Sequence, residues 1–436
     1  MKSGICRFAR ETRNITEVSG FSLVSNRTFR SLAFLLVLIT TACSGSENNT
    51  GEPDHIRILD DIPDHVLELE NLKAHSILDQ EADTVVLTRQ TIFESGEDLF
   101  MSGNIFNFTV DGQGRVYIVS GRPGNLGVYL FNADGSYLRT IGSYGQGPGE
   151  FEAIGSLDIL DNELILLDPR LQKFAIYSLD SFEKTREEII NLTEATRASQ
   201  ISAIARGTDL VLLENGKMVL EVGMSSLNEE MDGRHIYYYL LERCGTVNPA
   251  KLLKVDRHVR YFLPEREGWA IPITKPFNRS SLVSITRSGT FLTAWTEDFL
   301  IKKYDAYGSY IRSIYYPVEK SSFSLDQIQM ADHEHRMIRG EEIPDSWPAM
   351  HTMELDDEGR LWVATITDSE TDFTWWVLNR DGELLARFIK PGKRSKRAVI
   401  SKPLIAINDG YFYSHERNIN EGIDRIVKYK IEFIER

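Results

Sequence analysis

The stretches FTVDGQGRVYIV (108–119) and GVYLFNADGSYLRTI (127–141) decide the fold of this 436-residue chain. Each stretch consists of two apolar segments separated by a turn that contains Asp and Gly. Glycine adopts the positive φ that a tight hairpin needs, because it has no Cβ to clash with the backbone. The two stretches therefore predict consecutive β-hairpins, which together form one four-stranded sheet.

The same pattern recurs along the chain. Five further stretches repeat the first hairpin: LDILDNELILL (157–167), VLLENGKMVLEV (211–222), VSITRSGTFLTAW (283–295), MELDDEGRLWVA (353–364) and IAINDGYFYS (405–414). Most of them are followed by a second hairpin, such as the one that begins at Lys173. Four-stranded units that recur about every 40–50 residues are typical of propeller blades. We predict an all-β fold, a six-bladed β-propeller of four-stranded blades over residues 81–436.

The spacing of the hairpin turns predicts two insertions. The turn markers are 48, 54, 73, 70 and 51 residues apart, at Gly114, Asn162, Gly216, Gly289, Gly359 and Gly410. Blades three and four are therefore each followed by about twenty extra residues. The second insertion contains SLDQIQMADHEHRMIR (324–339), which predicts a short helix capped at Ser324 between blades four and five. Its Ile328 and Met337 would pack on the propeller rim.

The ends of the propeller segment predict how the ring closes, because an open blade would leave an unpaired strand edge. The stretch from Arg425 ends the chain without a full second hairpin, while DTVVLTRQTIF (83–93) precedes the first blade and has strand composition. We predict that these two segments share one sheet. In blade five, Trp375 and Trp376 are adjacent on a strand, so one would face a neighbouring blade and the other would face outward.

The N-terminus predicts export. LAFLLVLITTA (32–42) is too short to span a bilayer, follows Arg27 and Arg30, and resembles the apolar region of a signal peptide. It ends at Cys43 in a sequence that resembles a bacterial lipobox, although Thr40 stands where an aliphatic residue is usual. We predict a signal peptide over 1–42, with the true start codon downstream of Met1, at Val24. We also predict lipidation of Cys43, and a tether and lead-in over 43–80. Plain secretion is the alternative.

Composition narrows the possible partners. The chain has 49 Lys and Arg against 64 Asp and Glu, a net charge of −15, which disfavours nucleic acid as a partner. The basic run from Lys390 to Arg397 predicts a solvated loop. Cys244 is the only cysteine after Cys43, so an internal disulfide in the mature domain is excluded.

Two motifs suggest a family. TIGSYGQGPGEF (140–151) and DDEGRLWV (356–363) resemble NHL-type six-bladed propellers, particularly the propeller lipoproteins of Bacteroidetes and related bacteria. The resemblance implies the fold and an envelope location, which we take to be the outer membrane, with the lipid anchor as the only membrane contact. It implies no reaction, because propellers host many unrelated functions.

Propeller ligands usually bind at the face that carries the links between blades. We expect seven candidate ligand-binding residues there: Arg122, Tyr144, Glu150, Arg170, Arg279, Trp347 and His351. Structural roles compete with this interpretation, since Arg170 could bridge neighbouring blades and Glu150 could set the linker geometry. We predict a non-enzymatic, monomeric binding scaffold for a protein or glycan-like ligand, without a cofactor.

The alternative is a metal-dependent enzyme of the lactonase or lyase type, with its ion in the central channel. Only Asn107 and Asp158 offer oxygen ligands on the inner strands, whereas a hard cation usually takes six or more oxygens. The histidines of DHEH (332–335) are two residues apart, and two helical ligands normally lie at i and i+4. The sequence therefore favours the binding scaffold.

Overall fold

The first hairpin forms as the sequence predicts. Strands β3 (Asn104–Val110) and β4 (Val116–Arg122) are joined by a turn in which Gly114 has a φ of +74°. The buried carboxylate of Asp111 accepts hydrogen bonds from the Arg115 amide at 2.9 Å and from the Tyr117 hydroxyl at 3.0 Å. Glycine and a buried carboxylate together fix this turn.

The structure is a computed structural model. It describes residues 62–76, 82–96, 99, 101, 104–122, 124–198, 205–224, 235–257, 261–264, 270–273, 277–339, 342–392, 394, 404–418 and 422–435. The predicted signal peptide, Cys43 and the first part of the tether lie outside these residues. Within them, no helix has the length and apolar character needed to cross a membrane.

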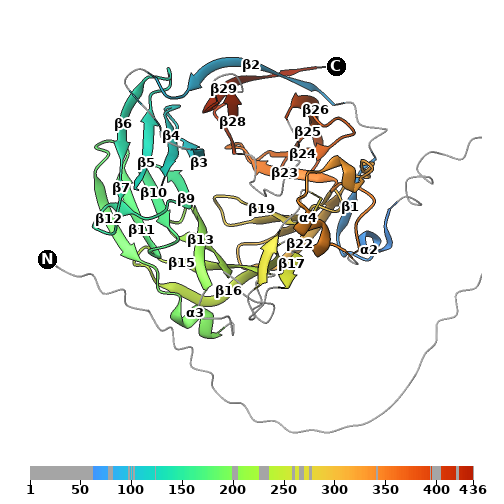
Figure 1. Ribbon diagram of the computed structural model, residues 1–436, viewed down its shortest axis with the longest axis horizontal. Coiled ribbons are helices and arrows are strands. Elements are labelled where there is room, and N and C mark those ends of the chain that lie inside the picture. The colour runs from blue at the N-terminus through green and yellow to red at the C-terminus, as the bar shows by residue number, and fades with distance from the viewer. Residues whose placement is uncertain are drawn as a thin grey trace, which may run out of the picture. The chain divides into compact units, whose positions relative to one another are not determined.

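Six antiparallel sheets surround a central axis (Figure 1). Blade 1 adds β5 (Asn125–Phe131) and β6 (Tyr137–Ile141) to β3 and β4. Blades 2 and 3 consist of β9 (Ser156–Leu160), β10 (Glu163–Asp168), β11 (Lys173–Ser178) and β12 (Lys184–Ile189), then β13 (Ala205–Leu212), β14 (Met218–Met224), β15 (His235–Leu241) and β16 (Val247–Asp256). Blades 4 and 5 consist of β19 (Ser281–Ile285), β20 (Phe291–Trp295), β21 (Leu300–Tyr304) and β22 (Tyr310–Tyr315), then β23 (Met350–Leu355), β24 (Leu361–Ile366), β25 (Asp372–Leu378) and β26 (Leu384–Pro391). The six-bladed all-β prediction is confirmed.

Blade 6 closes the ring as predicted. Its strands β27 (Ile405–Asn408), β28 (Tyr411–Asn418) and β29 (Ile423–Ile434) come from the end of the chain. The outermost strand, β2 (Thr84–Phe93), comes from its beginning and pairs antiparallel with β29, with Thr84 opposite Ile434. The first and last strands of the propeller therefore lie in one sheet.

The segment before β2 also belongs to the propeller. Helix α2 (Asp64–Leu67) buries Val66 against Leu300 and Tyr315, and β1 (Leu72–Ala74) pairs in parallel with β22 as a fifth strand of blade 4. The backbone of Asp83 then bonds to that of β26 in blade 5. We call residues 62–76 and 82–93 the strap, because they lie along the outer strands of blades 4, 5 and 6. The strap includes part of the 43–80 segment that we assigned to the tether and lead-in.

Each sheet buries both faces against its neighbours, as blade 5 illustrates. Trp376 packs against Phe299 of blade 4, with ring centroids 5.4 Å apart, while Trp375 packs against Phe412 of blade 6 at 5.4 Å. The two rings face opposite sides, as predicted, but both are buried. The expectation that one ring faces outward is wrong, because a blade in a closed ring has a neighbour on each side.

The links between blades hold the remaining elements. They are the parallel pair β7 (Ser143–Tyr144) and β8 (Glu150–Phe151), the helix α3 (Thr193–Ala198) and the hairpin β17 (Tyr261–Pro264) and β18 (Ala270–Ile273). Between blades 4 and 5 lie a 3-10 turn, η1 (Leu325–Gln327), and helix α4 (Asp332–Met337), where we expected one helix. The helix breaks because Ile328 is extended, at φ −116° and ψ 156°. Ile328 is buried on the rim as predicted, while the Met337 side chain lies outside the described residues.

Candidate functional site

The polar side chains of the inner strands connect neighbouring blades. Asn107 of blade 1 donates to the Gly155 carbonyl at 3.3 Å, and Ser284 of blade 4 donates to the Met353 carbonyl of blade 5 at 3.0 Å. Asp158 of blade 2 accepts a 2.7 Å hydrogen bond from the Leu212 amide of blade 3. An innermost strand has one unpaired backbone edge, so these side chains satisfy groups that would otherwise lack partners.

An ion pair joins blades 2 and 4 next to the axis. Arg287, in the turn after β19, donates to Oδ1 of Asp158 at 2.8 Å and also bonds Oδ2. Its guanidinium donates in addition to the carbonyls of Ile159 and Leu212, each at 3.0 Å. Both oxygens of Asp158 are therefore engaged within the protein. In the described part of the chain, no three His, Cys, Asp or Glu side chains gather as a metal site would require.

Four of the seven candidate ligand residues lie around the link between blades 1 and 2. Arg122 and Arg170 are exposed, and Tyr144 is 39% exposed on β7. Glu150 accepts a 2.8 Å hydrogen bond from the Gly147 amide, and so holds its own loop. Arg206 of blade 3 donates to the Arg170 carbonyl at 3.0 Å, so this bridge between blades uses the backbone of Arg170.

The GQGPGEF loop is held by buried and partly buried side chains of blade 2. Lys173 donates to the Gly147 carbonyl at 3.2 Å, and Glu187 accepts from the Gly149 amide at 2.7 Å. The fully buried Asp168 accepts from the Glu152 amide at 2.7 Å. These contacts give the motif a structural role as a folded connector.

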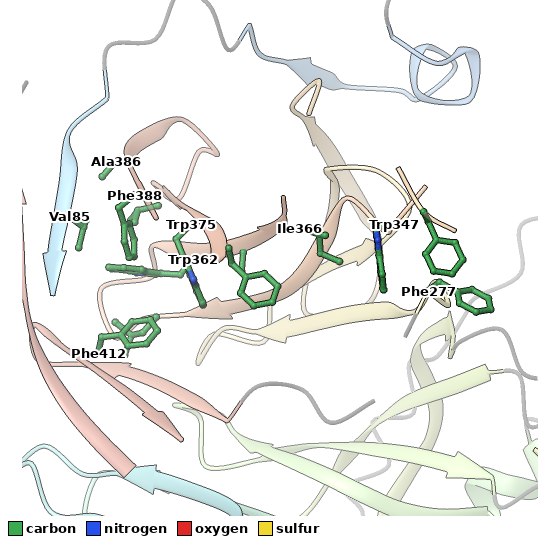
Figure 2. Packing of buried hydrophobic residues seen from close by; sticks show 14 of the residues in the cluster. Val85, Phe277, Trp347, Trp362, Ile366, Trp375, Ala386, Phe388 and Phe412 are labelled. Carbon is green, nitrogen blue, oxygen red and sulfur yellow. The ribbon is translucent and has the colours of Figure 1, made fainter. Parts of the chain in front are cut away.

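The other three candidates converge where the inserted segment meets blade 5. Arg279 is 8% exposed, forms an ion pair with Glu297 and donates to the Ser346 carbonyl at 3.0 Å. Trp347, which follows Ser346 in the sequence, is 4% exposed. His351 lies four residues after Trp347, on β23. Figure 2 shows this part of the core continuing from Phe412 and Trp362 through Ile366 to Trp347 and Phe277.

Several contacts hold the Trp347 ring in place. Its Nε1 donates to Oε1 of Gln327 in η1 at 3.0 Å, and its ring lies edge-on to Phe323 with centroids 4.9 Å apart. The guanidinium carbon of Arg394 lies 4.7 Å from the centre of the ring, a cation–π contact. The inserted segment therefore provides a rigid aromatic platform for Arg394.

His351 is partly buried on β23 and lies within electrostatic reach of the same arginine. Its ring lies 4.3 Å from the ring of Phe373, and the side chain makes no hydrogen bond to any residue that the structure describes. Burial, together with the positive charge of Arg394, lowers the pKa of His351 to about 4. The imidazole is therefore neutral near pH 7.

Sequence reasoning missed Arg394. We assigned the basic run from Lys390 to Arg397 to a solvated loop, but Arg394 is 8% exposed and Lys390 packs between the rings of Phe412 and Tyr429. For these two residues the prediction is wrong, because both cations are covered by aromatic side chains. A short basic run carries no local signal of such burial.

A cleft of about 810 Å³ lies on the link face, between blades 4 and 5. Six hydroxyl side chains line it: Thr84, Ser321, Ser322, Thr365, Thr367 and Thr374. Its other polar groups include Lys320 and the exposed Arg387, whose guanidinium lies 5.3 Å from the centre of the Trp376 ring. Asp368 lines the cleft, and its carbonyl accepts a hydrogen bond from Arg394.

A comparison with protein families agrees with the fold. The chain matches a family model, DUF5128, described as a six-bladed β-propeller, over residues 97–201. Among solved structures it is similar to a predicted exported protein of Bacteroides fragilis, with 13% identity, TM-score 0.46, and coverage of 83% of this chain and 99% of that one. It is also similar to a DUF4221 family member from Bacteroides vulgatus, with 12% identity, TM-score 0.49, and coverage of 81% and 100%.

An enzyme also appears among the similar structures. A streptogramin B lyase has 10% identity and a TM-score of 0.37, over 80% of this chain and 98% of that one. Identities this low carry no information about activity. The comparison with curated proteins finds no match. Sheet topology and the matching family model together support placing this chain among the six-bladed β-propellers.

Proposed function

We propose that this chain is an exported, lipid-anchored propeller that binds a glycan-like ligand in the cleft between blades 4 and 5. The observation that carries the proposal is the lining of that cleft. Hydroxyl groups both donate and accept, and a cleft with convergent polar groups and an aromatic wall suits a polyhydroxylated ligand. The cleft also lies on the link face, where we expected the ligand.

The inner strands give no comparable support to the enzyme alternative. Asn107 and Asp158, the two proposed oxygen ligands, already bond to neighbouring blades, and Asp158 is paired with Arg287. A stoichiometric ion in the purified protein, found by plasma mass spectrometry and stabilising it against heat, would instead favour the metal enzyme.

Glycan-array binding by the full mature chain tests the proposal. We expect Arg387→Ala to weaken binding of the best glycan by about tenfold, the loss typical of one charge-assisted hydrogen bond. Arg139→Ala is the matched control, because Arg139 also lies on an outer strand with its guanidinium over an aromatic ring, that of Phe182. Absence of any glycan binding, or equal losses in the two variants, would overturn the proposal.

The membrane tether has its own test. We expect the intact chain to incorporate radiolabelled palmitate in a bacterial host, and Cys43→Ser to abolish the labelling. Cys244→Ser is the control, because Cys244 lies within blade 3. Equal labelling of the wild type and Cys43→Ser would mean that lipidation at Cys43 does not occur.

A further inference from the structure

We propose that Arg394, which packs over the Trp347 ring, and the nearby His351 form a binding site for an oxyanion such as a carboxylate or a sulfate. The inference goes beyond the proposed glycan cleft and does not depend on it. It rests on the buried guanidinium of Arg394, in which two nitrogens lack partners in the described part of the chain, and on the partly buried imidazole of His351 near it.

The first observation is the state of the Arg394 guanidinium. The side chain is more than nine-tenths buried, and its Nη2 donates to the Asp368 carbonyl at 3.3 Å. Nε and Nη1 are buried and reach no acceptor among the described residues. Buried polar groups are almost always hydrogen-bonded, and a buried cation without a counter-charge is especially unfavourable. These N–H groups therefore call for an acceptor from outside the protein.

Carboxylates of the protein do not meet this need. Asp368 and Glu370 are the acidic groups that act on Arg394, and both are exposed. Within the described residues, no carboxylate oxygen lies within the 4.0 Å of an ion pair with Arg394. Arg279, by contrast, has its counter-ion in Glu297. An acidic group on a ligand would act as the counter-ion of Arg394, as Glu297 does for Arg279.

The second observation is the position of His351. A neutral imidazole has one N–H donor, and His351, which makes no hydrogen bond to the described residues, holds this donor within electrostatic reach of Arg394. A cation and a neutral donor suit the oxygens of one anionic group better than they suit a cation or a neutral ligand.

Aromatic contacts also hold parts of the site in place. Trp347 lies under the guanidinium, and the contacts with Gln327 and Phe323 fix its ring. Phe373 likewise covers one face of His351. Because the donors are already ordered, binding requires little further loss of side-chain entropy.

Titration calorimetry and thermal melts of the full mature chain test this inference, with sodium sulfate, sodium glucuronate and glucose as probes and sodium chloride holding the ionic strength constant. We expect sulfate or glucuronate to bind and to raise the melting temperature, and glucose to have no such effect. Binding of both anions would indicate a general oxyanion site, and binding of glucuronate alone a site for the carboxylate of a larger ligand. Absence of any effect from either anion would overturn the inference.

Substitutions test whether the anion binds at Arg394. We expect Arg394→Gln to weaken anion binding by about tenfold or more, as for loss of a charge-assisted contact. Arg380→Gln is the control, since Arg380 is exposed in the last turn of the same blade and donates to the Glu358 carbonyl. If Arg394→Gln fails to fold by circular dichroism, His351→Asn provides the second variant, with a smaller expected loss. Unchanged anion binding in the folded variants would overturn the assignment.

The glycan cleft and the oxyanion site can be disproved independently of each other. Arg387→Ala changes the cleft without touching Arg394, and Arg394→Gln does the reverse. Loss of neutral-glycan binding only in Arg387→Ala, with anion binding lost only in Arg394→Gln, would support both. Anion binding that is lost in Arg387→Ala and kept in Arg394→Gln would place the anion in the cleft and refute the inference.

Discussion

Two arginines of the propeller have opposite surroundings. Arg287, near the axis, bonds both oxygens of Asp158 and two backbone carbonyls of blades 2 and 3. Arg394, on the rim of blade 5, is more completely buried, but its side chain bonds only the Asp368 carbonyl within the described residues. The first arginine has its partners in the fold, whereas the second lacks them. The difference separates an arginine that stabilises the scaffold from one available to a ligand.

The largest effect on stability is expected at a buried carboxylate that pairs with an arginine. The Asp356 side chain is fully buried and accepts from Nε of Arg360 at 2.6 Å and from Nε1 of Trp362 at 2.9 Å. We expect Asp356→Ala to lower the free energy of unfolding by about 3–5 kcal/mol, since it leaves these donors unpaired. Urea denaturation measures the change, with the exposed neighbour Asp357→Ala as control. Similar losses in both variants would contradict this interpretation.

Acid should destabilise the folded chain through protonation of His351. Its pKa is about 4 in the folded chain and about 6.5 when unfolded, so between these values the unfolded state binds more protons. We therefore expect about 3 kcal/mol of stability to be lost as the pH falls from 6.5 to 4. Urea denaturation across this pH range should show a weaker dependence for His351→Asn than for the wild type. Replacement of the exposed His335 by Asn should leave the dependence unchanged, and equal slopes for the wild type and His351→Asn would rule out this origin.

The two arginines themselves should respond differently to replacement by methionine. Arg287→Met leaves the Asp158 carboxylate unpaired, and we expect a loss of about 2 kcal/mol, moderated because the Arg287 side chain is 43% exposed. Arg394→Met keeps an unbranched side chain over Trp347 and removes a buried charge without a counter-ion, so its stability should be unchanged or higher by about 1 kcal/mol. Comparable destabilisation in both, by urea denaturation without added anion, would mean that Arg394 is a scaffold residue.

The smallest effect is expected at an exposed pair. Arg197 and Glu194 in α3 lie 2.7 Å apart, with side chains 70% and 66% exposed. We expect Arg197→Ala to change the free energy of unfolding by less than about 0.5 kcal/mol, because solvent screens such pairs. A loss above 1 kcal/mol would show that factors other than hydrogen bonding and burial also determine how much each arginine contributes to stability.

The sequence predicts the blades well because their signals are local. Turn residues such as Gly114 mark each hairpin, and the strand composition of 83–93 is enough to pair it with the end of the chain. The parallel pairing of Leu72–Ala74 with β22 was missed, because it joins a three-residue segment to a strand more than 230 residues away. No local pattern specifies such a contact.

The arrangement of the candidate site follows from the sequence only where its residues are neighbours in the chain. Trp347 and His351 are close in the sequence, and the insertion between the turn markers placed them on the link face. The pairing of Asp158 with Arg287 spans 129 residues, and the burial of Arg394 depends on Trp347 from the inserted segment. Both contacts arise when the blades pack around a ring, and the sequence pattern of a single blade carries no signal of them.

The strap determines where mechanical load would enter the propeller. A chain pulled from the N-terminal side of the strap transmits tension first to α2 and β1 on blade 4, and next to the Asp83 bonds on blade 5. Only when both attachments have separated does the tension reach β2 and its long pairing with β29. The seam that closes the ring is therefore the last of the three attachments to bear force.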